Sequence, residues 1–494
     1  MQRKHDTIKI NLTGGVISAG DLMQIALEAD KARVDKIQFG ARQQLYIEVL
    51  VKLSEQFTTA LSKLGIQFEI NEENYPNIVS SYVAENVFHN AGWMSEGGYK
   101  DILETFNFRP QLKINLVDSG QSFIPFFTGN LNFISSGISN YWFLFLRFPK
   151  TNIIYKWPVL LYSLDLCRIS RLIEKIIWLR RDAFYDKASI DGDLLYKAVN
   201  SKEKFFIQPA TENLQLPDFR LPYYEGFNTY SNKTWLGIYR RNERFPLEFI
   251  KDICLLCMQT KVGQLYVTPW KTLIIKDLEP QHKKMWDYIL GKNRINVRHA
   301  SNELNWQVED LCEDGLVLKR YIVGQFDRDD LRTFGLCFAI KMRPKSGLFG
   351  SVIIQKCQEK NANKRMDRYD ILYTKNFNPN SKELILFRSK LPKENLPAYL
   401  ASLCKYYYEL LHGAELLEHD VYREKVSDEL IAEPIIKEIY QCPDCLTVYD
   451  ESYGDQTSGI EPGLSFFELP ENYSCFTCGE TKNKFVAIKK ALIQ

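Results

Sequence analysis

The sequence has few of the features that mark secreted, membrane-embedded or nucleic-acid-binding proteins. Its net charge is only +2 over 494 residues, and it contains just six histidines. The most apolar stretch, residues 122–148, is interrupted by proline, glycine and asparagine, so it predicts buried strands and no membrane span. Residues 1–6 lack the apolar run of a signal peptide, which predicts a cytoplasmic protein. No motif typical of nucleic-acid binding occurs.

The eleven cysteines do not indicate the disulfide framework of a secreted protein. In a reducing cytoplasm, thiols serve as metal ligands or as core residues. Seven cysteines precede residue 410, and among them only Cys254 and Cys257 are close together. This pair falls inside a predicted amphipathic helix, so we interpret it as part of a core. The other four cysteines lie near the C-terminus.

Those four cysteines form two Cys-x2-Cys pairs. Cys442 is paired with Cys445 and Cys475 with Cys478, and 29 residues separate the pairs. Two residues between cysteines allow both sulfurs of one tight turn to face the same metal, and a second turn completes a tetrahedral four-sulfur cage. Such a cage holds either zinc or a single iron.

The residues between the pairs resemble a rubredoxin. The resemblance rests on an aromatic core and a set of turn residues, namely Tyr449, Asp450, Gly454, Asp455, Gly459, Ile460, Pro462, Gly463, Phe466, Leu469, Pro470, Tyr473 and Phe485. It implies a one-electron carrier whose single iron is bound by Cys442, Cys445, Cys475 and Cys478. It also implies that Cys445 and Cys478 lie nearest the surface.

Two residues next to the expected ligands depart from the rubredoxin pattern. Leu446 stands where a glycine is usual, and Phe476 stands where a proline is usual. The glycine matters because the backbone there turns with positive φ while its amide points at sulfur. The resemblance therefore implies the ligand set but not the redox potential.

The N-terminal part of the chain repeats at a constant offset of 228 residues. Residues 8–48 and 236–275 each predict a strand, a turn, a helix and further strands. Seven apolar positions match: Ile17 with Phe245, Leu22 with Ile250, Ile25 with Ile253, Ile37 with Leu265, Phe39 with Val267, Leu45 with Leu273, and Ile47 with Ile275. This agreement indicates a duplicated half-domain.

The ends of the two repeats resemble sirohaem-dependent nitrite and sulfite reductases. Ala41-Arg42-Gln43, within residues 39–47, is similar to their threonine-threonine-arginine-glutamine segment. Thr268-Pro269-Trp270 is similar to the threonine-proline-tryptophan segment of their second half. The resemblance implies ferredoxin-like half-domains and a sirohaem whose carboxylates are bound by Arg42 and Lys113.

Residues that would complete such a reductase are missing. Gln111 stands where a second lysine would be, and Pro76-Asn77-Ile78 replaces an arginine-asparagine pair. The cluster cysteines, spaced Cys-x5-Cys and Cys-x3-Cys, occur nowhere in the chain, and residues 296–306 contain His299 but no cysteine. Because the bridged iron–sulfur cluster needs thiolate ligands, we expect neither the cluster nor sirohaem. We interpret the lone His299 as a hydrogen-bonding residue.

The length of the chain is enough for several domains. We expect an α+β multidomain protein with duplicated ferredoxin-like half-domains, an additional α+β region and a small C-terminal rubredoxin-like iron-binding domain. In the additional region, residues 316–323, 336–342 and 350–355 predict strands and residues 395–411 predict a helix. The expected boundaries are 1–75 and 226–310 for the half-domains, 76–225 for a reductase-like α+β region, 311–425 for an unassigned α+β region, 426–436 for a linker and 437–494 for the rubredoxin-like domain.

Charge is distributed unevenly along the chain. Residues 438–480 contain nine acidic side chains and no lysine or arginine. From Lys437 to the C-terminus the net charge is −4, which leaves +6 for the rest. Because complementary charge speeds association, the acidic segment suggests docking on a basic patch of a redox partner. A solvated acidic face that keeps a small domain soluble is an equally good interpretation.

We therefore expect an electron transfer protein that carries one electron at a four-cysteine iron centre and delivers it to a partner enzyme. The expected partners are a reductase as donor and an acceptor enzyme of nitrogen or sulfur assimilation. One alternative is a nitrite- or sulfite-reductase-like enzyme that binds a sirohaem-type tetrapyrrole through Arg42 and Lys113. A second alternative is a zinc-stabilised interaction scaffold. The sequence identifies no catalytic residue.

Overall fold

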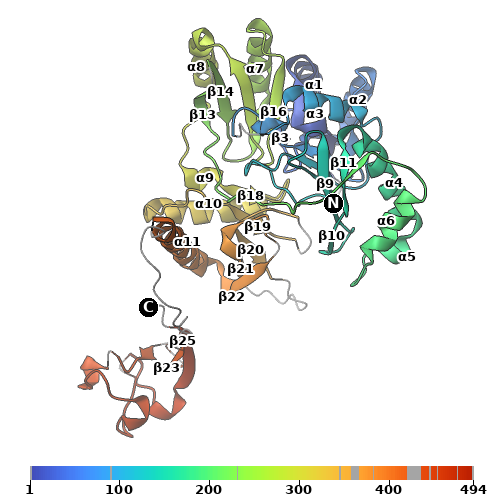
Figure 1. Cartoon of the computed structure of the whole chain (residues 1–494). Coiled ribbons are helices and arrows are strands. Elements are labelled where there is room, and N and C mark those ends of the chain that lie inside the picture. The colour runs from blue at the N-terminus through green and yellow to red at the C-terminus, as the bar shows by residue number, and fades with distance from the viewer. Residues whose placement is uncertain are drawn as a thin grey trace. The chain divides into compact units, whose positions relative to one another are not determined.

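The computed structural model describes residues 3–88, 92–230, 232–343, 347–357, 367–381, 383–419, 436–443, 445, 447–452, 454–475 and 477–491 (Figure 1). The chain divides into two compact units, Met1–Gly413 and Ala414–Gln494. Residues 426–435 of the expected linker, and the two departures Leu446 and Phe476, lie outside the described residues.

Two five-stranded sheets contain the sequence repeat. The first has the order β15-β3-β4-β1-β5, with β1 His5–Ile10, β3 Lys36–Phe39, β4 Leu45–Leu50, β5 Glu69–Ile70 and β15 Arg244–Pro246. The second has the order β13-β14-β17-β16-β2, with β2 Val16–Ser18, β13 Gly226–Tyr230, β14 Lys233–Ile238, β16 Gln264–Val267 and β17 Leu273–Leu278. Each half-domain thus gives one short strand, β2 or β15, to the sheet of the other.

The helices of the two half-domains share one core. Their bounds are α1 Ala19–Lys31, α2 Val51–Lys63, α7 Leu247–Gln259 and α8 Lys283–Lys292. α1 begins after Ser18, which caps the helix because its Oγ accepts a hydrogen bond from the Asp21 amide at 2.9 Å. α1 packs against α7, and both helices bury their apolar faces in a cluster that includes Cys254 and Cys257. The offset of 228 residues holds for both bounds of α1 and α7 and of β4 and β17.

Two further sheets also repeat a pairing pattern. The first has the order β12-β11-β9-β8-β7-β6, with β10 paired to β9; the strands are β6 Val79–Ser80, β7 Ile114–Val117, β8 Leu131–Ser135, β9 Tyr141–Arg147, β10 Ile154–Lys156, β11 Val159–Tyr162 and β12 Ile207–Pro209. The second has the order β18-β19-β20-β21-β22, with β18 Trp306–Val308, β19 Phe338–Lys341, β20 Val352–Lys356, β21 Arg368–Thr374 and β22 Leu384–Pro392. In each sheet two parallel pairings are followed by an antiparallel one. The duplication therefore extends beyond the half-domains.

The remaining helices cover these two sheets. They are α3 Glu96–Thr105, α4 Leu166–Leu179, α5 Arg181–Phe184, α6 Gly192–Asn200, α9 Ser301–Leu304, α10 Glu313–Arg328 and α11 Leu396–His419. Residues 122–148 contain β8 and β9, as predicted for buried strands. No helix among the described residues combines the length and the apolarity needed to cross a membrane.

One predicted strand in the additional region is wrong. Residues 316–323 lie inside the helix α10, whereas β19, β20 and α11 lie where two strands and a helix were predicted. The run Leu316-Val317-Leu318 is typical of a strand. However, Ile322, Val323 and Phe326 continue the buried set at helical spacing, and Val317 is exposed. Packing of this helical face against the sheet therefore outweighs the local preference.

The C-terminal unit is a small three-stranded sheet with long connecting loops. The sheet order is β24-β23-β25, with β23 Ile436–Gln441, β24 Val448–Tyr449 and β25 Val486–Ala491. All pairings are antiparallel. Short 3-10 helices at Gln456–Ser458, Phe466–Glu468 and Lys482–Lys484 interrupt the loops.

Candidate functional site

The four predicted cysteines converge at one point of the C-terminal unit. The sulfurs of Cys442, Cys445, Cys475 and Cys478 all lie within 4.8 Å of one another. Within the described ranges, this is the one group of three or more histidine, cysteine or acidic side chains placed to hold a metal. Cys442 and Cys475 are buried, Cys445 is half-buried and Cys478 is exposed. The expected exposure of Cys445 and Cys478 is confirmed.

The separations between the sulfurs fit a tetrahedral metal site. Cys442 Sγ lies 3.5 Å from Cys478 Sγ, and Cys445 Sγ lies 3.4 Å from Cys475 Sγ. A tetrahedron with metal–sulfur bonds of about 2.3 Å has edges of about 3.8 Å. Small outward movements of the sulfurs would therefore place a single ion among them.

The two cysteine turns have the same backbone hydrogen bonds. The amide of Cys442 donates to the carbonyl of Thr447 at 2.8 Å, and the amide of Cys475 donates to the carbonyl of Glu480 at 2.8 Å. The Cys445 sulfur is hydrogen-bonded by both the hydroxyl and the amide of Thr447, which lowers the pKa of this thiol to about 6. At Cys445 the fold thus favours the thiolate form that a metal requires. A hydrogen bond from the Glu480 amide lowers the pKa of Cys478, but the neighbouring sulfurs, that of Cys445 first, outweigh it and raise this pKa to about 12.

An aromatic core holds the two turns together. The rings of Tyr440 and Phe466 stack with their centroids 3.9 Å apart, and Tyr449, Tyr473 and Phe485 surround them. The Tyr473 hydroxyl donates to Asp455 at 3.0 Å. Three of the predicted turn glycines have positive φ: Gly454 at 64°, Gly459 at 73° and Gly463 at 99°. The residues between the cysteine pairs therefore have the structural roles predicted for them.

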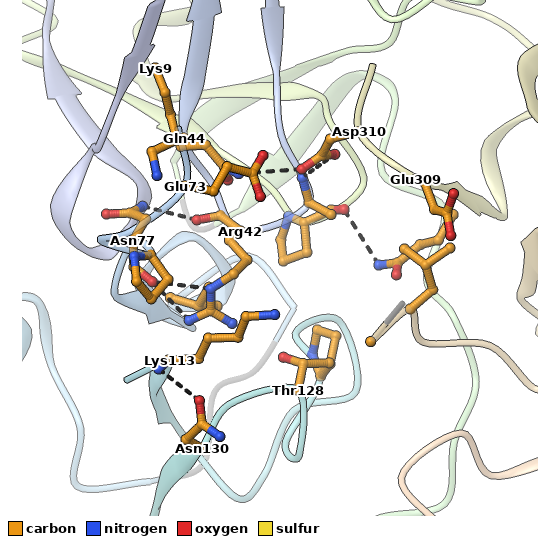
Figure 2. A pocket seen from close by; sticks show the side chains of 18 of the residues that line it. Lys9, Arg42, Gln44, Glu73, Asn77, Lys113, Thr128, Asn130, Glu309 and Asp310 are labelled. Carbon is orange, nitrogen blue, oxygen red and sulfur yellow. Dashed lines mark hydrogen bonds between the residues drawn. The ribbon is translucent and has the colours of Figure 1, made fainter. Parts of the chain in front are cut away.

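The N-terminal unit contains a cavity of about 620 Å³, which is lined by segments of both half-domains and of the two further sheets that contain β6 and β18 (Figure 2). Its size is within the range of small-molecule and cofactor sites. Arg42 and Lys113, the two residues matched to sirohaem binding, both line it, as do Asn77 and Gln111. Segments that lie far apart in the sequence therefore meet at one site.

Arg42 is held in the wall of the cavity by neutral acceptors. Its guanidinium donates to the carbonyl of Asn77 at 2.8 Å, to the carbonyl of Ile114 at 2.9 Å and to Oδ1 of Asn115 at 3.2 Å. Burial, together with the charge of Arg147, lowers the pKa of Arg42 to about 9. Most of its donors are used within the protein, so Arg42 supplies positive charge more than free hydrogen bonds.

Lys113 differs from Arg42 because its ammonium group has no hydrogen bond or ion pair within the described part of the chain. Figure 2 shows its side chain extending into the cavity, while its backbone amide donates to Asn130 Oδ1 at 3.0 Å. Burial, followed by the charges of Arg42 and Arg147, lowers the pKa of Lys113 to about 8. Positive charge therefore accumulates on this side of the cavity, where an anionic ligand would relieve it.

The opposite side of the cavity is acidic, which no motif in the sequence predicts. Asp310 accepts hydrogen bonds from the Ala41 amide at 2.9 Å and from Gln44 Nε2 at 3.3 Å, and it pairs with Lys271 at 3.2 Å. Glu309 accepts from the Arg343 amide at 2.9 Å. The offset that pairs Asn77 with Asn305 also pairs Val79 with Gln307, both of which line the cavity, but it gives no signal for Glu309 and Asp310 themselves.

The residues lining the cavity do not fit an iron–sulfur cluster bridged to a tetrapyrrole. No cysteine or histidine is among the described residues that line it. His299 lies elsewhere, with Nδ1 at 2.7 Å from Glu225 Oε1, so its interpretation as a hydrogen-bonding residue is confirmed. Cys254 and Cys257 are buried in the core of the half-domains, where burial raises the pKa of Cys254 to about 12. What the cavity does offer is positive charge that would pair with carboxylates.

Sequence comparison relates the C-terminal unit to known proteins. The profile of the rubredoxin family matches residues 439–485. Rubredoxin 4 of Rhodococcus sp. (strain Q15) is 41% identical over 51 residues, which are 10% of this chain and 85% of that protein. The high molecular weight rubredoxin of Moorella thermoacetica is 47% identical over 49 residues, which are 10% of this chain and 21% of that protein. The similarity to these proteins thus concerns about a tenth of the chain.

Structure comparison finds a match for most of the chain. The NirA protein of Mycobacterium tuberculosis superposes with a TM-score of 0.63 over 81% of this chain and 80% of that one. The sequence identity is 13%, so the match establishes the fold alone. The N-terminal unit therefore has a known fold although its sequence is highly divergent.

Proposed function

Because this chain belongs to the rubredoxin family through its C-terminal domain, we propose that it delivers single electrons from that domain to a partner enzyme. A rubredoxin domain binds one iron through four cysteine thiolates and exchanges electrons with redox partners. When bound, the iron supplies one-electron chemistry by alternating between the ferric and ferrous states. The convergence of four sulfurs within 4.8 Å carries the proposal.

The protein's own residues determine how electrons reach and leave the centre. Cys478 is exposed and Cys445 is half-buried, whereas Cys442 and Cys475 are covered by the protein. Electrons therefore enter and leave on the side of Cys445 and Cys478. The aromatic core on the other side keeps the two turns fixed, so the geometry of the ligands need not change between oxidation states.

The charge of the C-terminal domain indicates the chemistry of its partner. Residues 438–480 contain nine acidic side chains and no basic one, and several of the acids, such as Glu461, Glu468 and Glu471, are exposed. We propose that the partner, a reductase or an acceptor enzyme, presents a basic patch near its own redox centre. Association should then be fast at low salt and slow steeply as ionic strength rises.

Purified full-length protein provides the test. We expect one iron per chain and reversible one-electron reduction, followed optically through the sulfur-to-iron charge-transfer absorption. A colourless protein that carries zinc and retains its function would contradict electron transfer and support the interaction scaffold. Cys357→Ser is the matched control, because Cys357 is a half-buried cysteine of the N-terminal unit and is not one of the four converging cysteines.

A second candidate function rests on the cavity. The unpaired ammonium of Lys113, close to Arg42 and Arg147, favours a carboxylate-bearing ligand, and the short motifs around Arg42 and Trp270 resemble sirohaem-dependent reductases. On this proposal the N-terminal unit binds a sirohaem-type tetrapyrrole. Because no cluster ligand is among the described residues that line the cavity, any electron would have to come from another centre, such as the rubredoxin iron.

An absorption spectrum separates the two functions. Full-length protein expressed with sirohaem available should show a Soret band only if the tetrapyrrole binds. Lys113→Met should then remove most of that band, whereas Lys156→Met, at an exposed position, should leave it unchanged. Absence of the Soret band in the unmodified protein would exclude the second function without affecting the first.

A further inference from the structure

Two threonine hydroxyls connect the cysteine turns. Thr447 Oγ1 lies 3.1 Å from Cys445 Sγ and 2.9 Å from Thr477 Oγ1. Thr447 follows Cys445 by two residues, and Thr477 immediately precedes Cys478. We propose that this hydroxyl pair raises the reduction potential of the iron centre by donating a hydrogen bond to the Cys445 thiolate.

The chemistry of the ligand determines the direction of both hydrogen bonds. A cysteine bound to a metal has lost its proton, so Cys445 Sγ can only accept. The single hydroxyl proton of Thr447 must therefore be directed at the sulfur. Thr447 Oγ1 then has no proton left for Thr477, so the Thr477 hydroxyl donates to Thr447. The resulting chain runs from Thr477 through Thr447 to the sulfur, and each bond polarises the next.

The effect on the potential follows from charge. An iron with four thiolates gains one unit of negative charge when it is reduced, and no atom is added or lost. A hydrogen-bond donor to sulfur stabilises the more negative, reduced state more than the oxidised state. Removing the donor should therefore make reduction harder and lower the potential.

The equivalent position of the second cysteine turn is occupied by an acceptor. Glu480 has the same position relative to Cys478 as Thr447 has relative to Cys445, because the two residues accept matching backbone hydrogen bonds from Cys475 and Cys442 at 2.8 Å. The Glu480 carboxylate pairs with Lys484 at 3.0 Å, and a carboxylate accepts and does not donate. A hydroxyl donor two residues after the second cysteine is therefore present in the first turn and absent from the second.

Substitution of Thr447 gives the direct test. Thr447→Val keeps the β-branched shape and removes the donor, and Thr447→Ser keeps the donor. In the full-length iron-loaded protein, we expect Thr447→Val to disfavour reduction by roughly tenfold, which is about 59 mV for a one-electron couple, while Thr447→Ser stays close to the original value. The charge-transfer absorption should shift in the valine variant only.

Further variants keep the proposal falsifiable. Thr477→Val should lower the potential by a smaller amount, because it removes only the polarising bond, and it remains informative if Thr447→Val loses iron. Thr481→Val is the matched control, since Thr481 Oγ1 bonds the Glu480 carboxylate and no sulfur. Unchanged potentials in both Thr447→Val and Thr477→Val, or equal shifts in Thr447→Val and Thr447→Ser, would overturn the proposal. None of these outcomes depends on the identity of the partner enzyme.

Discussion

Arg42 and Asn77 hold each other in place through hydrogen bonds in both directions. The guanidinium of Arg42 donates to the Asn77 carbonyl at 2.8 Å, and Nδ2 of Asn77 donates to the Arg42 carbonyl at 2.9 Å. The segment Pro76-Asn77-Ile78 stands where the resemblance to sirohaem reductases led us to expect an arginine. Together with Gln111, which stands where a second lysine would be, this leaves the cavity wall two cations short of the reductase pattern, and Arg42 is engaged in an internal contact.

Asn77→Ala should destabilise the N-terminal unit. Nδ2 of Asn77 also donates hydrogen bonds to the carbonyls of Leu12 at 2.6 Å and Gln43 at 3.0 Å, and the residue is 3% exposed. Loss of a buried donor leaves carbonyls unsatisfied, so we expect the free energy of unfolding to fall by about 1–3 kcal/mol. Chemical denaturation of the full chain would measure this. Asn74 is exposed, so Asn74→Ala is the control. An equal fall in its unfolding free energy would contradict a stabilising role for the buried hydrogen bonds of Asn77.

A buried ion pair next to the cavity provides a second prediction. Lys9 and Glu69 pair between β1 and β5 with side chains only 4% and 6% exposed. Glu69→Ala would leave the Lys9 ammonium buried without its charge partner, and we expect a loss of about 3–5 kcal/mol in unfolding free energy. The exposed pair of Lys100 and Glu96 is the control, and Glu96→Ala should cost under about 1 kcal/mol. A similar fall in unfolding free energy at both sites would contradict the expectation that burial makes the loss of a charge partner costly.

The iron site could be predicted from sequence because its ligands are local. Each Cys-x2-Cys turn places two sulfurs by itself, and turn residues such as Gly454 and Gly459 need positive φ wherever they occur. The half-domains could be predicted because their apolar positions repeat at one offset. Neither inference required knowledge of contacts between distant segments.

The cavity and the helix α10 could not be predicted completely, because both depend on tertiary contacts. Arg42 and Lys113 were found through short motifs, whereas Glu309 and Asp310 have no local signal. These acids reach the cavity through tertiary contacts such as the hydrogen bond from the Ala41 amide to Asp310. Leu316 to Leu318 favour a strand locally, and only the packing of α10 against its sheet selects the helix. Sequence patterns describe local geometry better than they describe sites assembled from distant segments.

Loss of the metal should unfold the C-terminal unit alone. Among the described residues of this unit, the apolar core is a cluster of six buried side chains, namely Tyr440, Tyr449, Ile460, Phe466, Leu469 and Tyr473. A core of this size needs a structural metal for stability. In Cys442→Ser we expect loss of iron and of the near-ultraviolet circular dichroism from the packed aromatic side chains of this core, while the denaturation midpoint of the N-terminal unit stays unchanged. A folded, metal-free C-terminal unit would contradict this expectation.

Binding of a polycarboxylate in the cavity should weaken as pH rises through about 8. Burial and the nearby charges of Arg42 and Arg147 lower the pKa of Lys113 to about 8, so its side chain is charged below this pH and neutral above it. Arg42, whose pKa is lowered to about 9, is still mostly charged at pH 8 and about half charged at pH 9, so it adds a smaller part to the same pH dependence. The acidic groups Glu73 and Asp310 oppose binding of the ligand. Uroporphyrin, a tetrapyrrole with carboxylates on its ring, is a suitable fluorescent probe.

The expected loss of affinity between pH 7 and pH 9 is roughly tenfold. This corresponds to losing one charge-assisted hydrogen bond, which contributes about 1.5 kcal/mol to binding. Lys113→Met should bind weakly at both pH values and show a reduced pH dependence, because the ammonium of Lys113 is gone and only Arg42 still loses charge. The exposed Lys156→Met should behave as the unmodified protein does. If Lys113→Met kept the full pH dependence, the titrating group would lie elsewhere. Unchanged affinity in Lys113→Met would mean that the ligand does not use the cationic side of the cavity.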